Sequence, residues 1–239
     1  MNNYNSLVNK KILVIDDDVE NQLLIKTYLK FNNYEILSAY NGNDGIVSAS
    51  ANLPDIILLD VNMPNMNGYE VIRLLKANEK TKEIPVIFIT ASDDMKSVIN
   101  SFRSGGVDYI GKPFSGEELL SRIKLHLELQ KYKKENKDRA EKYSSIVELA
   151  HEGIWVIDDN EKTNYLNNKM AEILGYTAEE MMGKQFFDFM DARGIEISKN
   201  QIKKSKQGIK EQYDFEFINN QKKRIYAIVS ASPIIDREN

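Results

Sequence analysis

The segment from Pro54 to Pro64, PDIILLDVNMP, constrains the fold of this 239-residue chain more than any other. Within it, Ile56–Leu59 is an unbroken apolar run that ends at Asp60. Such a run is too short for a helix, and the flanking prolines would interrupt one. It is typical of a strand buried on both faces, as in a parallel sheet. Asp60 is therefore expected at the carboxyl end of a central strand, where open α/β sheets bind ligands.

Other segments of the first half alternate between strand and helix patterns. Apolar runs predict strands over Lys11–Ile15, Tyr34–Tyr40, Pro54–Asp60, Ile84–Thr90 and Val107–Ile110. Helical spacing predicts helices over Val19–Leu29 (with Val19, Leu23, Leu24 and Tyr28 as its apolar positions and Leu29 nearby), Gly42–Ala51, Gly68–Ala77 (with Val71, Ile72, Leu74 and Leu75 on its buried side) and Asp93–Arg103. Ser115 and Glu118 have the spacing of a capping box that begins a last helix. This alternation predicts a doubly wound α/β fold with a parallel five-stranded sheet, for which 2-1-3-4-5 is one common strand order.

Acidic residues follow the first and third predicted strands. Asp16–Asp18 come directly after Lys11–Ile15, and Asp60 ends its own strand. In the order 2-1-3-4-5 these two strands are neighbours and the winding reverses between them, so the carboxylates should line one crevice. Thr90 and Lys112, at the ends of the fourth and fifth strands, should reach the same edge of the sheet.

This set of side chains suits a phosphoryl group. Converging carboxylates repel one another unless they bind protons or a cation. Mg²⁺ prefers octahedral oxygen ligands and is usually held by one or two carboxylates together with a phosphate. Lys112 adds a positive charge and Thr90 adds a hydroxyl donor. Because an aspartate carboxylate can act as a nucleophile, the pattern predicts a phosphoaspartate site that needs Mg²⁺, or Mn²⁺ in its place.

Two other interpretations of these residues are open. Asp60 and its neighbours could simply be turn residues at strand ends, since Asp and Asn favour turns. The chain could also be a phosphatase of the haloacid-dehalogenase type, which has Asp-x-Asp after a first strand, as in Asp16–Asp18. That interpretation needs a further acidic pair after Lys112, and none follows. A nucleotide-binding fold is disfavoured because the turn after the first strand has no glycine.

The segments VIDDD, LLDVNMPNMNGYE, VIFITA and DYIGKPF resemble, in this order, the receiver domain of response regulators. The resemblance covers roughly residues 10–128. It implies that Asp60 accepts phosphate from a histidine kinase or histidine phosphotransfer protein. It also implies that the metal ligands are Asp16, Asp17, Asp60 and the backbone carbonyl of Asn62, and that Thr90 and Lys112 bind the phosphoryl group while Tyr109 moves inward. The resemblance further implies a cis peptide bond between Lys112 and Pro113 and a turn at Gly68. Asn62 and Ser92 occupy positions that influence the lifetime of the phosphate in this family. Asp18 is expected to cap a helix.

Composition limits the setting of the protein. The chain contains no cysteine, which excludes disulfides and thiolate metal sites and suits a reducing compartment. The net charge of −4 gives no general reason to expect nucleic acid or an anionic membrane as a partner. No apolar run approaches the ~20 residues of a membrane helix, and the first residues do not form a signal peptide. The expected location is the cytoplasm.

A heptad pattern follows the receiver-like region. Large or apolar residues step by four and three through Leu125, Leu129, Tyr132, Asn136, Arg139, Tyr143, Ile146 and Ala150. Asn136 at a seam position favours a parallel dimer in register, whereas Arg139 weakens that interpretation. A single solvated helix is the alternative, since charge runs are usually exposed. His126 in this helix is expected to be a surface residue.

The second half has an α+β pattern. Strands are expected over Gly153–Asp158, Lys162–Asn167, Glu211–Ile218 and Arg224–Ile235, and helices over Asn168–Leu174 (closed by Gly175), Thr177–Met182 and Ile195–Lys206. The succession EGIWVID, YLNNKMAEILGYTAEEMMGK and YDFEFINNQKKRIYAIVSASPI resembles a PAS sensor domain with an antiparallel sheet that lacks its usual last strand. Neither flavin nor haem is expected, because there is no cysteine and the Ile195–Lys206 helix has no histidine. Trp155 and the group Phe186, Phe187 and Phe189 are expected in the core, and His151 is not expected to be a phosphoacceptor.

The two resemblances and the heptad pattern together imply a receiver domain over residues 10–128, a helical linker over 129–145 and a PAS domain over 146–239. We expect phosphorylation of Asp60 to be transmitted through a dimeric helix to the PAS domain. One alternative is the front part of a hybrid sensor histidine kinase or cyclic-dinucleotide synthase whose catalytic domain lies beyond residue 239. Another is a PAS chemosensor with a vestigial receiver.

Overall fold

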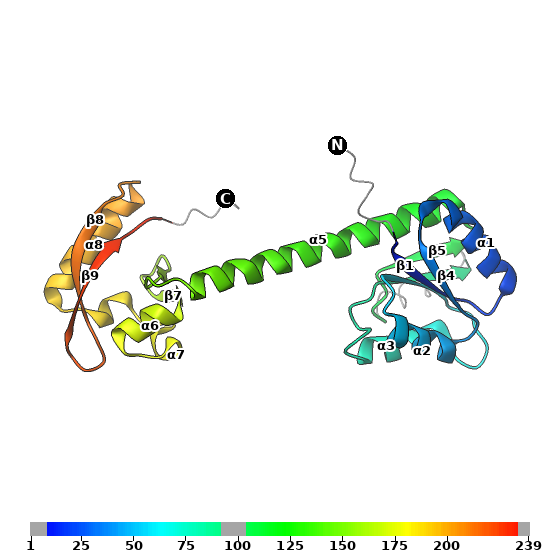
Figure 1. Cartoon of the computed structure of the whole chain (residues 1–239), viewed down its shortest axis with the longest axis horizontal. Helices are drawn as coiled ribbons and strands as arrows, with labels where there is room; N and C mark the ends of the chain where they lie inside the picture. The colour runs from blue at the N-terminus through cyan, green and yellow to red at the C-terminus, as the bar shows by residue number, and fades with distance from the viewer. Residues whose placement is uncertain (1–8, 92–103, 234–239) are drawn as a thin grey trace. The chain divides into compact units, whose positions relative to one another are not determined.

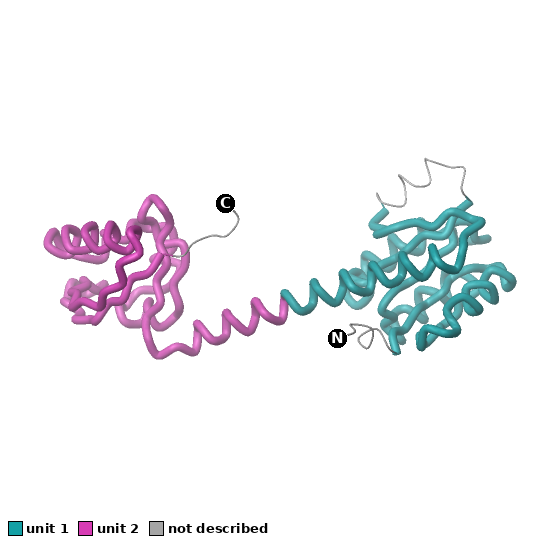
Figure 2. The backbone as a smooth tube through the Cα atoms, turned by 90° about the horizontal axis from the view of Figure 1, so that it is seen from above, with its two compact units in different colours: residues 1–136 teal, residues 137–239 magenta. Residues whose placement is uncertain are grey.

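The computed structural model describes residues 9–91 and 104–233, so Ser92 and the predicted helix over Asp93–Arg103 lie outside the described residues. The chain divides into two compact units, Met1–Asn136 and Lys137–Asn239, which are coloured separately in Figure 2. The boundary falls within helix α5 (Gly116–Glu148), the long helix of Figure 1. Within the described ranges, none of the helices combines the length and the apolar character needed to cross a bilayer.

The first unit is built on a five-stranded parallel sheet with the predicted order β2-β1-β3-β4-β5. Its strands are β1 (Lys11–Ile15), β2 (Glu35–Ala39), β3 (Ile56–Asp60), β4 (Val86–Ala91) and β5 (Asp108–Lys112). Its described helices are α1 (Val19–Leu29), the 3-10 turn η2 (Lys30–Asn32), α2 (Gly42–Asn52), α3 (Gly68–Ala77) and the first part of α5. The predicted doubly wound α/β architecture is confirmed.

Both faces of this sheet are covered, which explains why its central strands β1, β3 and β4 are mainly apolar. Alternate residues of β3 point to opposite sides, and all of them are buried. Ile57 and Leu59 pack in the cluster that contains side chains of α2 and α3, whereas Ile56 and Leu58 pack in the cluster that contains side chains of α1 and α5. Each such buried side chain contributes roughly 1.5–3 kcal/mol relative to an exposed one.

Helix α1 buries a different face from the one suggested by its apolar residues. The side chains that face the sheet are Gln22, Ile25 and Leu29, while Val19 is 63% and Leu23 is 64% exposed. The helix begins with Asp18 as its N-cap, as expected, because the Asp18 carboxylate accepts a hydrogen bond from the backbone N–H of Glu20. Hydrophobic spacing alone did not identify the buried face, because the buried residues include a polar one.

Two further predictions about helix faces are wrong. Leu74 in α3 is 44% exposed, because Val71, Ile72 and Leu75 already fill the side of α3 that faces the sheet. His126 in α5 is not a surface residue. Only 11% of its side chain is exposed, and its Nε2 lies 2.9 Å from the buried carboxylate of Asp108.

The second unit contains two antiparallel strand pairs and several short helices. Its elements are β6 (Trp155–Ile157), β7 (Thr163–Leu166), α6 (Asn168–Leu174), α7 (Ala178–Met181), the 3-10 turn η3 (Phe186–Phe189), α8 (Ala192–Lys206), β8 (Gln212–Ile218) and β9 (Arg224–Ser230). Strand β6 pairs with β7, and β8 pairs with β9. Strand β9 ends at Ser230, earlier than expected, and the predicted end at Ile235 lies outside the described residues.

Aromatic side chains form the centre of the second unit. The ring of Trp155 lies 4.8 Å from that of Phe186 and 5.2 Å from that of Phe189, in edge-to-face arrangements. Phe189 is buried in one cluster with Phe215 and Phe217 of β8, as predicted for a core residue. Trp155, Phe186 and Phe187 are half-buried and pack against this cluster. Such pairs add roughly 0.5–1.5 kcal/mol to the free energy of burial.

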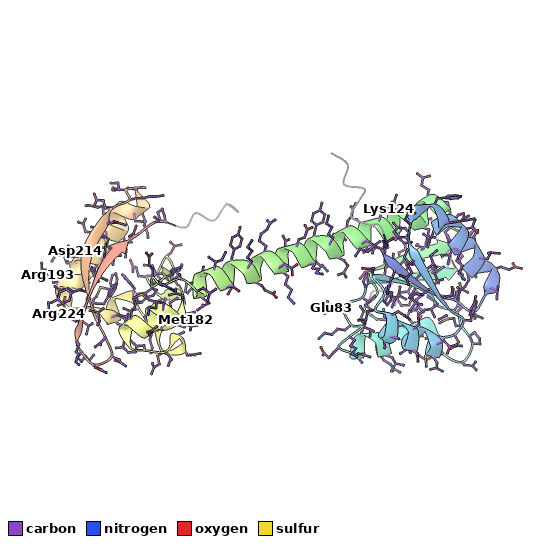
Figure 3. The ribbon with its side chains drawn as sticks, in the orientation of Figure 1. Glu83, Lys124, Met182, Arg193, Asp214 and Arg224 are labelled. Carbon is purple, nitrogen blue, oxygen red and sulfur yellow. The ribbon has the colours of Figure 1, made fainter. Side chains whose placement is uncertain are left out.

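Polar contacts join helix α8 to the β8–β9 hairpin. Arg224, labelled in Figure 3 at the start of β9, forms an ion pair with Glu216 of β8 and lies 3.3 Å from the Asp191 carboxylate that caps α8. The turn between β8 and β9 is held to the end of α6, where Asn220 donates hydrogen bonds to Gly175 and Leu174. Gly175 has φ of 74°, so it closes α6 as predicted.

Candidate functional site

Three carboxylates meet at the carboxyl edge of the sheet in the first unit. Asp16 follows β1 and is 1% exposed, Asp60 ends β3 and is 5% exposed, and Asp17 is exposed to solvent. Each offers an oxygen, and these oxygens all lie within 4.8 Å of one another. Strands β1 and β3 are neighbours, which brings together residues that are 44 positions apart in the chain.

Lys112, the last residue of β5, points into this cluster. Its Nζ donates a hydrogen bond of 2.6 Å to Asp60 Oδ1 and one of 3.2 Å to Asp16 Oδ2. The backbone N–H of Asn62 donates to Asp60 Oδ2 at 3.0 Å, and that of Asp18 donates to Asp16 Oδ1 at 2.8 Å. Each buried carboxylate is therefore held by one ammonium and one backbone amide.

One ammonium cannot neutralise this group of acids. Burial raises the pKa of the Asp60 carboxyl above its usual value, and the charge of Asp16 adds to this, while Lys112 offsets only part of it. Burial alone would lower the pKa of Lys112, but Asp60 and Asp16 outweigh it, so the pKa of Lys112 lies above its usual value. The ionised cluster retains two excess negative charges, which one divalent cation would neutralise. Its oxygen donors are those that hard divalent cations prefer.

Thr90 and Tyr109 lie on the strands that the sequence predicts for them. Thr90 of β4 is 4% exposed and lies one residue beyond Ile89, which pairs with Asp60 across the sheet. Tyr109 of β5 is half-buried and packs against the cluster on the α2 and α3 side. The peptide bond between Lys112 and Pro113 is cis. The ends of β1, β3, β4 and β5 thus bring Asp16, Asp60, Thr90 and Lys112 to one edge of the sheet, whereas Tyr109 lies near the start of β5.

The loop after Asp60 requires a glycine at position 68. The Gly68 N–H donates to the carbonyl of Val61 at 3.0 Å. A Cβ atom there would lie 2.5 Å from the carbonyl oxygen of Asp60 and 3.0 Å from Cα of Val61. Gly68 is the first residue of α3, so it is needed for this close approach and not for a left-handed turn conformation.

We therefore expect Gly68→Ala to lower the stability of the first unit by about 1–3 kcal/mol, since backbone atoms would have to move. Thermal unfolding followed by circular dichroism measures this loss of stability. Wild-type stability of Gly68→Ala would contradict this account of the loop.

The sequence interpretation missed two polar groups. Gln22 of α1 is 1% exposed, and its amide nitrogen donates to the carbonyls of Asp16 and Ala39. Asp108 at the start of β5 accepts hydrogen bonds from Arg122 and contacts His126, both from α5. Helical spacing could have indicated both groups. Gln22 falls on the same helical face as Ile25 and Leu29, and Arg122 and His126, four residues apart, share one face of α5.

The predicted seam on α5 is uncovered in the single chain. Leu125 is 49%, Leu129 45%, Tyr132 56% and Tyr143 62% exposed, and Asn136 between them is also exposed. The receiver-facing side of the same helix buries Leu119, Ile123 and Leu127 instead. The apolar seam therefore lies on a side of α5 that does not contribute to the core of the first unit.

Comparison with known families agrees with this fold. The family model for the response regulator receiver domain matches residues 12–124, and the model for the PAS fold matches residues 141–239. The chain therefore contains a response regulator receiver domain, which belongs to two-component phosphorelay signalling. A PAS domain, which is a sensor or interaction domain, follows the receiver.

Individual relatives match mainly through the receiver. The chain is 33% identical over 171 residues to a "Probable transcriptional regulator ycf27" of Porphyridium aerugineum, covering 70% of this chain and 66% of that protein. It is 39% identical over 123 residues to the response regulator ArlR of Staphylococcus saprophyticus, covering 52% of this chain and 54% of ArlR. The chain thus spans between half and two thirds of the length of these relatives.

A solved structure shows the same receiver fold. It is titled "Crystal structure of signal receiver domain of putative Luxo repressor protein from Vibrio parahaemolyticus". The match has a TM-score of 0.50 and 27% identity, and it covers 53% of this chain and 96% of that one.

Proposed function

We propose that Asp60 accepts a phosphoryl group from a histidine kinase or a histidine phosphotransfer protein in a Mg²⁺-dependent reaction. The observation that carries this proposal is the convergence of three carboxylate oxygens within 4.8 Å, with Lys112 Nζ 2.6 Å from Asp60. This cluster has a nucleophile, a cation site and a fixed positive charge in one place. Those are the parts that phosphoryl transfer needs, because most of its catalysis is positioning and charge stabilisation.

In this proposal the side chains have separate roles. An Asp60 carboxylate oxygen attacks phosphorus, an O–P bond forms, and the N–P bond to the donor imidazole breaks. Asp16, Asp17, Asp60 and the backbone carbonyl of Asn62 would hold the cation, which when bound would neutralise the charge of the carboxylates and of the phosphoryl oxygens. Lys112 shifts from Asp60 to one phosphoryl oxygen, and the Thr90 hydroxyl donates to another. Tyr109 packs inward as Thr90 moves.

The experiment that tests this function is incubation with acetyl phosphate, a small phosphodonor, followed by intact-mass measurement. We expect one phosphoryl group per chain in the presence of Mg²⁺ or Mn²⁺ and none after chelation. The same linkage should be lost in alkali, as an acyl phosphate is. Failure to label with Mg²⁺ would contradict the function and favour a vestigial receiver that leaves the PAS domain as the active part.

We further propose that the signal passes through a parallel homodimer of α5 to the PAS domain. Nearly every residue from Tyr132 to Ile146 is exposed in the single chain. A helical segment of this length without tertiary contacts is marginal in water. Its exposed large residues follow a heptad spacing, with Asn136 at a position that favours a parallel register. A second copy of α5 is the partner that matches this spacing.

The dimer is tested by substituting one seam residue. Tyr143→Glu should weaken dimerisation by about tenfold or more, because it places two like charges at one layer of the seam. Ser144→Glu adds the same charge on the neighbouring residue, which does not belong to the seam, and should leave the dimer intact. Analytical ultracentrifugation over a concentration series measures both. Equal dissociation constants for the two variants would contradict the seam.

A further inference from the structure

Gln22 is a buried polar residue beside the acidic cluster. Its Nε2 donates hydrogen bonds to the backbone carbonyls of Asp16, at 3.0 Å, and of Ala39, at 2.7 Å. Asp16 is the first residue after β1, and Ala39 is the last residue of β2. The Gln22 amide therefore joins the ends of two neighbouring strands at the edge where the cation site lies.

This arrangement has a cost that an apolar residue would avoid. The side-chain oxygen of Gln22 is buried and has no hydrogen-bond partner among the described residues. Leaving a buried acceptor unpaired is destabilising, because the acceptor loses its hydrogen bonds to water and gains none in the protein. Ile25 and Leu29 occupy the same face of α1 and are fully buried, so an apolar side chain would suit the position by packing alone. The function of Gln22 should therefore lie in its two donated hydrogen bonds.

The two hydrogen bonds act on the backbone that carries the metal ligands. Asp16 is followed directly by Asp17, and the Asp16 carboxylate accepts a hydrogen bond from the N–H of Asp18. The Asp16 N–H donates to the same Ala39 carbonyl that Gln22 contacts. Asp16 is thus held on its N–H, on its carbonyl and on its carboxylate. Gln22 supplies the contact from α1, and it touches none of the reacting groups itself.

We propose that Gln22 is a positioning residue for the divalent cation: it holds the backbone of Asp16 so that the carboxylates of Asp16 and Asp17 point at one ion. This inference rests on the cation site proposed above. Hydrogen-bonding partners behind metal ligands typically change metal affinity by 10–100-fold when they are removed. The residue should therefore affect cation binding far more than the rate of phosphoryl transfer.

The test is Gln22→Met, which keeps the length of the side chain and removes both donors. Isothermal titration calorimetry should show Mg²⁺ binding that is about tenfold weaker than in the wild type. With acetyl phosphate, the Mg²⁺ concentration for half-maximal labelling should rise by a similar factor. The labelling rate at saturating Mg²⁺ should stay within about twofold. A lower saturating rate with unchanged Mg²⁺ affinity would overturn the proposal.

Thr81→Val is the matched control. Thr81 is also 1% exposed, and its hydroxyl donates to a backbone carbonyl, that of Leu75, in α3. This variant loses a comparable buried hydrogen bond and should keep wild-type Mg²⁺ affinity. If Gln22→Met does not fold, Gln22→Asn decides the question, since its shorter amide cannot reach both carbonyls. If the folded Gln22 variant binds Mg²⁺ as tightly as the wild type, the proposed role of Gln22 is wrong. If the wild-type protein itself binds no Mg²⁺, the proposed function is wrong.

Discussion

Asp60→Asn is expected to reduce Mg²⁺-dependent labelling by acetyl phosphate to background, a loss of several orders of magnitude, because the nucleophilic oxygen is removed. The amide of asparagine fits the same space, so the loss should not come from unfolding. Asp18→Asn is the matched control. It makes the same chemical change two residues after Asp16 and keeps the helix N-cap, for which asparagine is equally suited.

The stability of Asp60→Asn provides an independent check. Because burial raises the pKa of Asp60 in the folded chain, the folded state binds more protons than the unfolded state between the two pKa values. Wild-type stability therefore falls as pH rises through that range, and the loss persists at neutral pH. Without a divalent cation, Asp60→Asn should melt at the same temperature as the wild type or higher at pH 7. A lower melting temperature would contradict the assignment of excess negative charge to this cluster.

Lys112→Met is expected to have the second large effect. It removes the ammonium that pairs with Asp60 and Asp16, which are 5% and 1% exposed. Breaking a buried ion pair lowers the free energy of unfolding by up to about 3–5 kcal/mol. We expect a loss of about 2–3 kcal/mol for Lys112→Met, because the Lys112 side chain is 26% exposed. Because the pKa of Lys112 is raised, the contribution of its ion pairs to stability is fully present at pH 7–9. That contribution is lost only as the pH rises through the pKa of Lys112 in the folded state.

Divalent cations should reverse much of this destabilisation, because they neutralise the same carboxylates. Thermal unfolding with chelator and with Mg²⁺ measures this difference. Labelling should still fall by roughly 10²–10³-fold in Mg²⁺, since a fixed charge that stabilises the transferred group is lost. Lys80→Met is the control, because Lys80 is an exposed lysine outside the site. Equal melting temperatures for Lys112→Met and Lys80→Met in the presence of chelator would contradict the proposed role of Lys112 in neutralising the carboxylates.

Much of the fold follows from local patterns in the sequence. The apolar runs of β1 and β3 have no polar position to expose to water, so only a sheet covered on both faces could accommodate them. Each of these strands ends at or just before an aspartate, which marks the functional edge before any coordinates are known. The expected strands and helices agree with the described ones to within two residues at nearly every end in the first unit.

The rotation of each helix about its own axis could not be obtained in the same way. Val19 and Leu23 are apolar but exposed, while Gln22 is polar and buried. Spacing shows which residues share a face, but the sheet decides which face it covers. The same applies to His126, whose burial depends on Asp108, a residue 18 positions earlier on β5.

The amino-acid sequence was enough to predict the kind of fold, the edge of the sheet at which the site lies and the residue types that form it. This is possible because strand periodicity and strand ends are local properties of the chain. The three-dimensional packing was needed to see how the carboxylates of Asp16, Asp17 and Asp60 meet around Lys112. It was also needed to explain why position 68 is a glycine and to identify the contacts of Gln22. These are distances between atoms on different elements, and they depend on the packing of helices against the sheet, which no local pattern encodes.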